Sequence, residues 1–454
     1  MAELKSGNAL SLAAGVIAVG LLGWWGISQE RESAAPHTAH GRIPVYYWHM
    51  WSAEWKPVME NVVTEFNASQ TKYEVIPLQV PYGNADSKFL LSVAGGDPPD
   101  VMAQWTQAIS TWSQGGILQP LETRMTPTEK NYFDNETYPV IHNNGWYKGH
   151  LYGMVMGVDV YACYYRADDF KQAGVDPDPA KFPSTLEGLT ALGKKLDRTD
   201  ASGNLTRVGF LPAGLTQFAP AFGGGFYDQS TRDVALDTPQ NLKALTYIVD
   251  EHNRLGMDRL LRYNASLKPQ NGADWPFIDG SMSISLDGEW RVQQLAKFAP
   301  NLKYHVAPLP APAGGKPMAS FSVTNFLTIP AGAKHSEGAW EFIKFWAGMD
   351  NPARAAKYNT AFGWLPSSPR MAGSPVYQAY LKKYPEYKTF VDLAASKNIV
   401  TTPPVPYQMF LMDRISAADD LAERGSVTPG MALKGLTKDV TRERSQRKEL
   451  GYDE

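Results

Sequence analysis

The feature that most constrains the fold of this chain is an alternation of short apolar strands with amphipathic helices near its beginning. Strands are predicted at residues 43–47, 73–80 and 101–103, and helices at residues 54–68 and 86–94. The first helix carries its apolar residues at helical spacing, which forms one stripe against a sheet. Alternation of this kind predicts a parallel, doubly wound sheet, in which ligands bind beyond the carboxyl ends of the strands.

Tryptophans follow two of these strands. Trp48 and Trp51 come after the first strand, and Trp105 comes at the end of the third. They are therefore expected near one opening at the carboxyl edge of the sheet. The chain has 12% aromatic residues, with 13 Trp and 22 Tyr, which is more than a core needs. Each indole taken alone is more often a core residue, but the set indicates a surface that binds a ligand.

A further strand is predicted within residues 149–177, where two kinds of residue alternate. Val158 and Val160 belong to one face of this strand, and Asp159 and Tyr161 belong to the other. An acidic residue therefore stands at the start of an otherwise apolar strand. It is either a carboxylate that caps a turn or a group that meets a ligand.

The same segment resembles a known family. It reads G-x-x-Y-G, then an apolar strand that ends in Y-Y, then D-F-K-x-A-G-x-D-P. This order is similar to that in the extracellular solute-binding proteins of ABC importers, above all in the carbohydrate-binding group that includes the maltodextrin-binding proteins. The D-P-P-D-V segment at residues 97–101 and the G-x-L-x-P-L segment at residues 116–121 resemble the same family. Arg166 departs from it, because the family usually has Asn or Asp there, so no role is carried over to that side chain.

The resemblance implies an α/β protein with a two-lobed periplasmic-binding-protein fold. Each lobe would be a doubly wound, mostly parallel sheet, a hinge of several strands would join the lobes, and Asp159 would face the cleft between them. A helix of the second lobe is predicted to begin with a capping box from Ser184 to Glu187. The expected division is residues 1–40 as a signal or anchor segment with a linker, residues 41–158 plus 322–360 as the first lobe, and residues 159–321 plus 361–454 as the second lobe with a helical C-terminal part.

The N-terminal segment is expected to stand apart from the fold. An apolar run at residues 9–27 follows Lys5, which predicts either an export signal or an uncleaved membrane anchor. The protein is therefore expected to be periplasmic or otherwise extracytoplasmic. Cys163 is the only cysteine, so the sequence allows no internal disulfide, no lipoprotein site after the apolar run and no thiolate metal cluster.

We predict a binding site in which aromatic rings contact the C–H faces of a sugar and polar side chains bond its hydroxyls. Phe226 follows three glycines, Trp290 ends a D-G-E-W segment, and Trp364 lies in an F-G-W-L-P segment. Each of these segments resembles a part of the family's cleft or hinge, and Asn325 stands where the family often has glycine. The predicted ligand-binding residues are Trp48, Trp51, Glu54, Tyr82, Trp105, Asp159, Phe226, Trp290, Asn325 and Trp364.

The predicted function is that of the substrate-binding component of an ABC transporter, which binds a di- or oligosaccharide and delivers it to the membrane permease. Two alternatives stay open. A receptor for a polyol phosphate such as glycerol 3-phosphate would need Arg or Lys at the cleft, and the segments placed there have few. A glycosidase would need two carboxylates that face one bond, for which Asp159, Asp287 and Glu289 are available.

Other chemistries are not expected. The sequence has neither a G-x-S-x-G nucleophile elbow nor an H-E-x-x-H zinc motif, and no Lys-Ser/Thr pair follows the three glycines at residues 223–225 to make a phosphate loop. We therefore expect no catalytic residues, no cofactor and no metal. The net charge of -3 gives no reason to expect a nucleic acid as partner, and the protein is expected to be a monomer.

Overall fold

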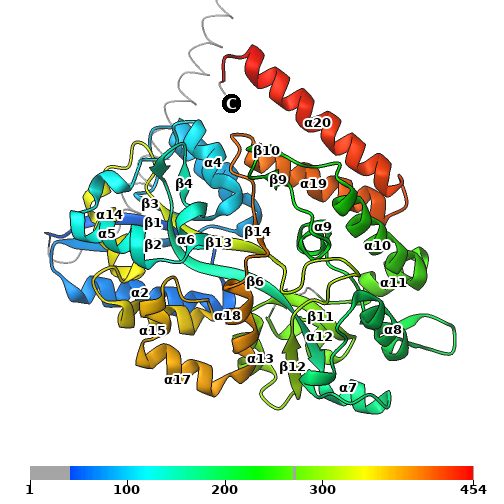
Figure 1. Cartoon of the computed structure of the whole chain (residues 1–454). Helices are drawn as coiled ribbons and strands as arrows, with labels where there is room; N and C mark the ends of the chain where they lie inside the picture. Colours follow the sequence, from blue (N-terminus) through cyan, green and yellow to red (C-terminus); the bar gives the residue numbers. More distant parts are fainter. Residues whose placement is uncertain (1–40, 269–271, 453–454) are drawn as a thin grey trace, which may run out of the picture.

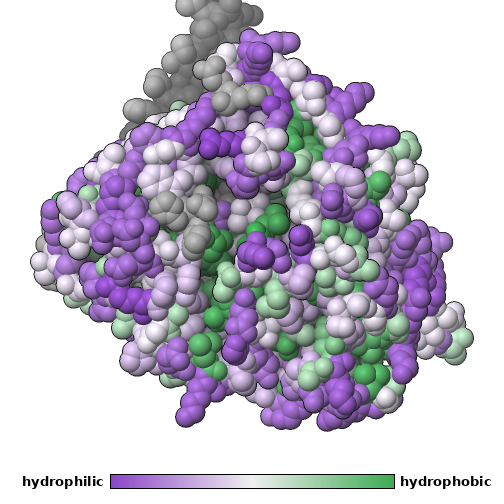
Figure 2. All heavy atoms as spheres, viewed as in Figure 1, coloured by the Kyte–Doolittle hydropathy of each residue, from purple (hydrophilic) through white to green (hydrophobic). Residues whose placement is uncertain are grey.

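The computed structural model describes residues 41–268 and 272–452, so the predicted signal or anchor segment at residues 1–40 lies outside the described part. The described chain is an α/β protein, as predicted (Figure 1). None of its described helices is both long enough and apolar enough to cross a membrane. Figure 2 shows that one face of the molecule is largely hydrophilic, with its hydrophobic residues in small separate patches.

One ten-stranded sheet runs through the described part of the molecule, and two short hairpins stand beside it. The hairpins are β4 (Trp146–Tyr147) with β5 (His150–Leu151), and β9 (Tyr227–Asp228) with β10 (Asp233–Val234). The strands of the sheet are β1 (Ile43–His49), β2 (Tyr73–Gln79), β3 (Val101–Trp105), β6 (Met154–Arg166), β7 (Arg198–Thr199), β8 (Leu205–Phe210), β11 (Met282–Gly288), β12 (Tyr304–Ala307), β13 (Ser320–Thr328) and β14 (Ile399–Thr401).

The order of the sheet is β2-β1-β3-β13-β6-β11-β8-β7, with β12 added to β6 and β14 to β13. Strand β1 pairs in parallel with β2 and β3 on the left of Figure 1. Strand β8 pairs in parallel with β11. The pairs in the middle, β3 with β13, β13 with β6 and β6 with β11, are antiparallel. The parallel pairing expected of a doubly wound sheet is therefore found in both outer parts, and the two parts meet at antiparallel strands.

Strand β6 connects the two parts because it has a different partner along each half of its length. Its first half, up to Val160, pairs with β13, and its second half, from Tyr161, pairs with β11. A strand of 13 residues is long enough for both pairings. Strands β6, β13 and β14 together form the connection between the two outer parts of the sheet, which we call the crossing. It corresponds to the predicted hinge of several strands.

The helices cover both parts of the sheet, and most begin with local signals that the sequence carries. Pro follows the N-cap in many of them, as in α10, where Thr238 accepts a hydrogen bond from the backbone N–H of Asn241. The capping box predicted from Ser184 is wrong by one residue, because Thr185 is the N-cap of α8 and accepts from the N–H of Gly188. The helices are α2 (Lys56–Ser69), α3 (Ala85–Ala94), α4 (Thr106–Gln114), α5 (Pro127–Glu136), α6 (Pro139–Asn144), α7 (Ala167–Gln172), α8 (Leu186–Leu196), α9 (Leu215–Phe218), α10 (Pro239–Leu255), α11 (Met257–Ser266), α12 (Pro276–Asp279), α13 (Arg291–Phe298), α14 (Ser336–Ala347), α15 (Pro352–Phe362), α16 (Pro369–Ala372), α17 (Pro375–Lys383), α18 (Lys388–Ala394), α19 (Gln408–Glu423) and α20 (Pro429–Glu449).

Two large hydrophobic clusters hold these elements together. The first packs α2 and α14 against β1 and also takes in α15, α17 and α18. The second packs α8, α10, α19 and α20 around Tyr165 of β6. Each fully buried aliphatic or aromatic side chain in them contributes about 2 kcal/mol relative to exposure. The lobe boundaries at residues 158/159, 321/322 and 360/361 stay a prediction.

Candidate functional site

A pocket of about 430 Å³ opens beside the antiparallel pair formed by β6 and β13. Asp159 and Tyr161 come from β6, Val323 and Asn325 from β13, and the other lining residues from the ends of elements around these strands. The lining residues are Trp51, Trp55, Tyr82, Gln107, Asp159, Tyr161, Trp290, Val323, Asn325, Phe362 and Trp364. Seven of these eleven are aromatic, so the pocket offers flat apolar faces with a small polar floor.

Six of the ten residues predicted for the binding site line this pocket: Trp51, Tyr82, Asp159, Trp290, Asn325 and Trp364. They come from positions as far apart in the sequence as 51 and 364. Asp159 and Asn325 are less than a tenth exposed, whereas Tyr82 is 64% exposed and stands at the rim. A ligand in the pocket would therefore meet both buried polar groups and a solvent-exposed ring.

The other four predicted residues are not among the lining residues. Trp48 lies in β1 with the ammonium of Lys88 5.4 Å from its ring centre. Glu54 accepts a hydrogen bond of 2.5 Å from the Nε2 of Gln294. Phe226 is fully buried in the second hydrophobic cluster, because the glycine turn before it directs the chain inward. The side chain of Trp105 lies outside what the structure describes, although its backbone pairs with Asn325.

Five lining residues were missed by the sequence analysis: Trp55, Gln107, Tyr161, Val323 and Phe362. Tyr161 carried a usable signal, because it lies two residues after Asp159 and so shares its face of the strand. Trp55 was assigned to the helical stripe that packs on the sheet, but it belongs to the short 3-10 turn before α2 and is only half-buried. Gln107, Val323 and Phe362 carried no such signal.

The aromatic residues form two groups around the pocket. Phe362 and Trp364 stack in parallel, with ring centres 4.2 Å apart and planes at 8°, and Trp51 lies 5.6 Å from Trp364. In the second group, Trp290 meets Tyr161 edge to face, with ring centres 5.8 Å apart. Rings fixed by such contacts lose little conformational freedom when a ligand binds.

Two glycines make room for two of these indoles. A Cβ on Gly157 of β6 would lie 2.4 Å from Cδ2 of Trp364, and a Cβ on Gly288 would lie 1.8 Å from Cζ3 of Trp290. Both distances are far shorter than real contacts, so each indole packs directly on backbone that only glycine leaves uncovered. The D-G-E-W segment therefore has glycine at its second position because the ring of Trp290 folds back over it.

The polar floor of the pocket is formed by Asp159 and Asn325. Asn325 donates a hydrogen bond of 2.9 Å from Nδ2 to Oδ2 of Asp159. The second oxygen of Asp159, Oδ1, is buried and has no donor. Burial raises the pKa of this carboxyl, and its hydrogen bonds with Glu289 and Asn325 act in the opposite direction. The group can accept a hydrogen bond from a ligand that enters the pocket.

The pocket carries no positive side chain among its described lining residues. Arg291 lies close in sequence to Trp290, but its Nε donates to Asp287 at 2.9 Å and its Nη1 donates to Gln294 at 2.7 Å. Its guanidinium group also lies over the ring of Trp275, 4.4 Å from the centre. This arginine is therefore held within the protein and does not line the pocket.

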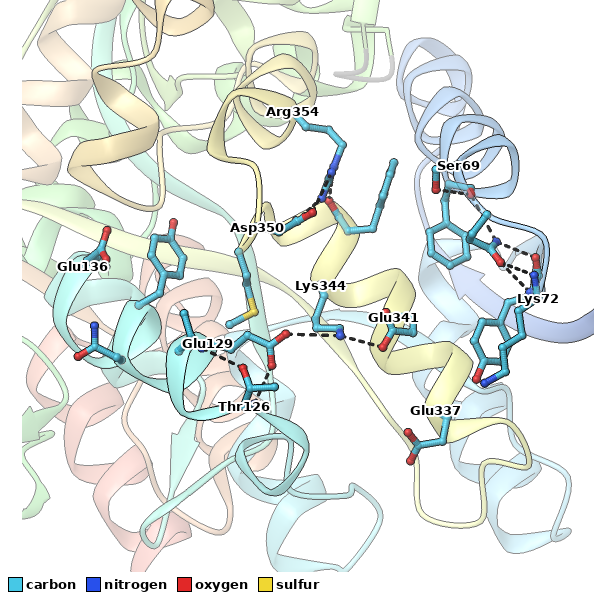
Figure 3. A pocket seen from close by; sticks show the side chains of 18 of the residues that line it. Ser69, Lys72, Thr126, Glu129, Glu136, Glu337, Glu341, Lys344, Asp350 and Arg354 are labelled. Atoms are coloured by element: carbon cyan, nitrogen blue, oxygen red, sulfur yellow. Dashed lines mark hydrogen bonds and ion pairs between the residues drawn. The ribbon is translucent and has the colours of Figure 1, made fainter.

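A second, larger groove of about 920 Å³ lies between the ends of α2, α5, α14 and α15, and its chemistry is different (Figure 3). Its charged side chains neutralise each other: Lys344 bonds both Glu129 and Glu341, and Arg354 bonds Asp350. Opposite charges that are already paired at a surface leave little to bind a small ligand. No three His, Cys, Asp or Glu side chains in the described ranges are placed to hold a metal. We therefore take the smaller aromatic pocket as the candidate site.

The sequence of this chain matches a known protein family and several characterised relatives. The sequence profile of the bacterial extracellular solute-binding proteins matches residues 61–389. A maltotriose-binding protein of Pyrococcus abyssi is 21% identical over 360 residues, which are 75% of this chain and 71% of that protein. An sn-glycerol-3-phosphate-binding periplasmic protein of Shigella dysenteriae is 22% identical over 378 residues, 80% of this chain and 81% of that protein.

Solved structures agree with the fold. The structure of CpMnBP1 with mannotriose bound superimposes with a TM-score of 0.78 at 25% identity, and the match covers 87% of this chain and 99% of that one. The maltose/maltodextrin-binding domain MalE of Bdellovibrio bacteriovorus, bound to maltotriose, matches with a TM-score of 0.70 at 19% identity over 89% of this chain and all of that one.

Proposed function

Because this chain belongs to the bacterial extracellular solute-binding protein family, we propose that it binds a neutral di- or oligosaccharide in the aromatic pocket and presents it to the permease of an ABC importer. One observation carries the proposal: seven aromatic rings surround a buried carboxyl–amide pair, with no cation among the described lining residues. Sugars have apolar C–H faces that pack on such rings, and hydroxyls that bond to such pairs.

The size of the pocket supports a small oligosaccharide. A volume of about 430 Å³ lies within the usual range for small-ligand sites, roughly 300–1,000 Å³. The exposed ring of Tyr82 at the rim offers a place for a further sugar unit. The maltotriose-binding relative and the mannotriose-bound structure are consistent with a ligand of this kind.

A polyol phosphate is the less favoured ligand. It would suit the relatives that bind sn-glycerol 3-phosphate. However, a phosphate needs Arg, Lys or a helix N-terminus to bond its oxygens. Asp159 would instead repel a dianion, and the aromatic walls would not bond its oxygens.

Catalysis is also disfavoured by the arrangement of the carboxyls. A glycosidase holds its two carboxyl groups about 5–9.5 Å apart, with the scissile bond between them. Glu289 is fully buried beside Asp159 and is not among the lining residues of the pocket. Asp287 is held by Arg291. We therefore propose a receptor and no enzyme.

The crossing strands suggest how the receptor works. Both β6 and β13 line the pocket and continue into the two outer parts of the sheet. Bending at this crossing would close the aromatic walls on the sugar, and the permease would recognise the closed form. We place the protein outside the cytoplasm, exported by its N-terminal signal or held by it as an anchor, and acting as a monomer.

Isothermal titration with maltotriose, mannobiose, mannotriose and glycerol 3-phosphate tests the proposal. We expect at least one of the three sugars to bind, with an affinity that changes little with ionic strength. Binding of glycerol 3-phosphate alone, weakening as salt rises, would favour the polyol phosphate receptor. Release of monosaccharide from any of the three sugars would show a glycosidase.

A further inference from the structure

Under the floor of the pocket, a second carboxyl lies beside Asp159: Oε2 of Glu289 accepts from the backbone N–H of Val160, the next residue of β6, and the two carboxyls interact. Glu289 is 0% exposed and lies between β11 and α13, while Asp159 is 8% exposed and faces the pocket. The two groups come from positions 130 residues apart in sequence. Like charges this close cannot both ionise in a buried site without a large cost.

The hydrogen bonds around the pair account for two of its four oxygens. Oε2 of Glu289 accepts from the backbone N–H of Val160 at 3.0 Å, and Oδ2 of Asp159 accepts from Asn325 at 2.9 Å. The remaining oxygens, Oε1 of Glu289 and Oδ1 of Asp159, are buried and have no donor. Two buried acceptors without a donor are costly, and one proton between the two carboxyls would supply a donor.

We propose that Asp159 and Glu289 share one proton, and that Glu289 acts as a positioning residue, whose carboxylic acid donates to Asp159 and orients that carboxyl toward a sugar hydroxyl. The shared proton follows from the contacts of the pair alone, whereas its effect on sugar binding rests on the proposed function. Carboxylate dyads that share a proton are known to form where burial and proximity act together.

Within the described part of the chain, no positively charged group is among those that shift the pKa of either member of the pair. On α13, Arg291 is bonded to Asp287 and Gln294. On β6, burial raises the pKa of Tyr161, and the charge of Asp159 raises it further. Tyr377 and Tyr380 of α17, and Tyr387 in the turn after it, are affected by the charge of Glu289, but burial is the main reason why the pKa of each hydroxyl is raised. Burial likewise raises the pKa of both members of the pair, which favours keeping the proton.

A sugar-free measurement tests the shared proton. The folded pair holds a proton that the unfolded chain gives up near its usual carboxyl pKa of roughly 4, so its contribution to stability is full below that pH and is lost as the pH rises toward the folded pKa. Glu289→Gln replaces the acid by an amide that still accepts from Val160 and donates to Asp159. We expect the melting temperatures of the two proteins to be similar at about pH 5.5, and the variant to melt at least about 2 °C higher at about pH 8.5.

The comparison has internal controls. His49, whose pKa burial lowers to about 4, is present in both proteins, so its titration cancels. If Glu289→Gln does not fold, the same melting comparison is made with Asp159→Asn. In that variant the new amide donates a hydrogen bond to an ionised Glu289. Melting curves of wild type and variant that shift in parallel with pH would overturn the proposal.

Titration with mannobiose and mannotriose tests the effect on binding. We expect the affinity of the wild type to fall about tenfold between about pH 5.5 and about pH 8.5, because a closed pocket favours the protonated pair. Glu289→Gln should bind within about threefold of the wild type at the lower pH and lose this pH dependence. Asp419→Asn is the matched control: burial raises the pKa of Asp419 to about 7, but this carboxyl does not line the pocket, so it should keep the wild-type binding profile.

The two tests fail separately. If neither sugar binds at either pH, the proposed function is wrong for these ligands, and the melting comparison still decides whether the proton is shared. If sugar binds to the wild type with the same affinity at both pH values, Glu289 has no positioning role, whatever the melting comparison gives.

Discussion

Trp290 shows what a single side chain contributes to the pocket. It is half-buried, lines the pocket and touches Tyr161, so part of its ring is available to a ligand. We expect Trp290→Ala to weaken sugar binding by about 2 kcal/mol, roughly thirtyfold, with little change in the melting temperature of the sugar-free protein. Calorimetric titration and thermal unfolding measure the two effects.

Trp48 provides the matched control for that substitution. It is also half-buried but does not line the pocket. Trp48→Ala should therefore leave sugar affinity within about twofold of the wild type, as expected for a residue without ligand contact. Equal losses of affinity in both variants would mean that the pocket does not bind the sugar through Trp290.

Gly157 is a second residue whose replacement has a definite expected effect. A methyl group there would overlap the indole of Trp364, and neither the strand nor the buried ring has room to move. Gly157→Ala should lower the free energy of unfolding by about 1–3 kcal/mol and also weaken sugar binding, because Trp364 is displaced. Gly435→Ala, in α20 with nothing near its Cβ position, should cost no stability. Urea unfolding of both variants makes the comparison.

Single residues also mark the limit of sequence-based prediction. Asp159 and Asn325 were both expected at the site, but their hydrogen bond joins positions 166 residues apart, which no local pattern reports. Phe226 was expected at the cleft on its glycine-rich neighbourhood. In the structure, the side chain of Asn241 bonds both the N–H and the C=O of Gly225, and the ring of Phe226 packs in the second hydrophobic cluster instead. Glu289 was noted only as an available carboxylate, since its contact with Asp159 requires the folded sheet.

At the scale of elements, local periodicity predicted the helices and strands far better than it predicted their partners. Helix α3 was expected at residues 86–94 and spans Ala85–Ala94, and β1 extends two residues beyond its predicted end. These boundaries depend on residues within a few turns of one another. The antiparallel pairing of β13 with β3 and β6 joins segments more than 150 residues apart, so it could be expected only from the family resemblance.

Helix α20 illustrates how burial is divided within one element. Its first half buries Ala432, Leu433, Leu436 and Val440 in the second cluster, while its last turns are charged and largely exposed. We expect Leu433→Ala to lower the free energy of unfolding by about 2–5 kcal/mol, because it leaves a cavity. Leu450→Ala, at a residue that is 74% exposed, should change it by less than about 0.5 kcal/mol. Neither should alter sugar affinity, and urea unfolding with calorimetric titration checks both points.

At the scale of the whole molecule, the proposed closure has a measurable signature. A compact chain of this length has a radius of gyration of about 22 Å. Adding a sugar that binds should reduce this radius in small-angle X-ray scattering, because the two outer parts of the sheet approach each other around the crossing strands. Trp290→Ala should need more sugar to reach the same reduction. A radius that stays constant at saturating sugar would rule out closure.

The shared strand β6 also bears on how the chain could be divided. A polypeptide cut just after Arg166 would leave the second half of β6 without β11, and its partner fragment would carry β11 with a bare edge. Each fragment alone should therefore tend to aggregate through its unpaired strand. The two unpaired strands, β6 and β11, are complementary because they form five residue pairs in the intact chain. Co-expressed fragments should therefore reassemble, which makes this cut a natural position for a split reporter of sugar uptake.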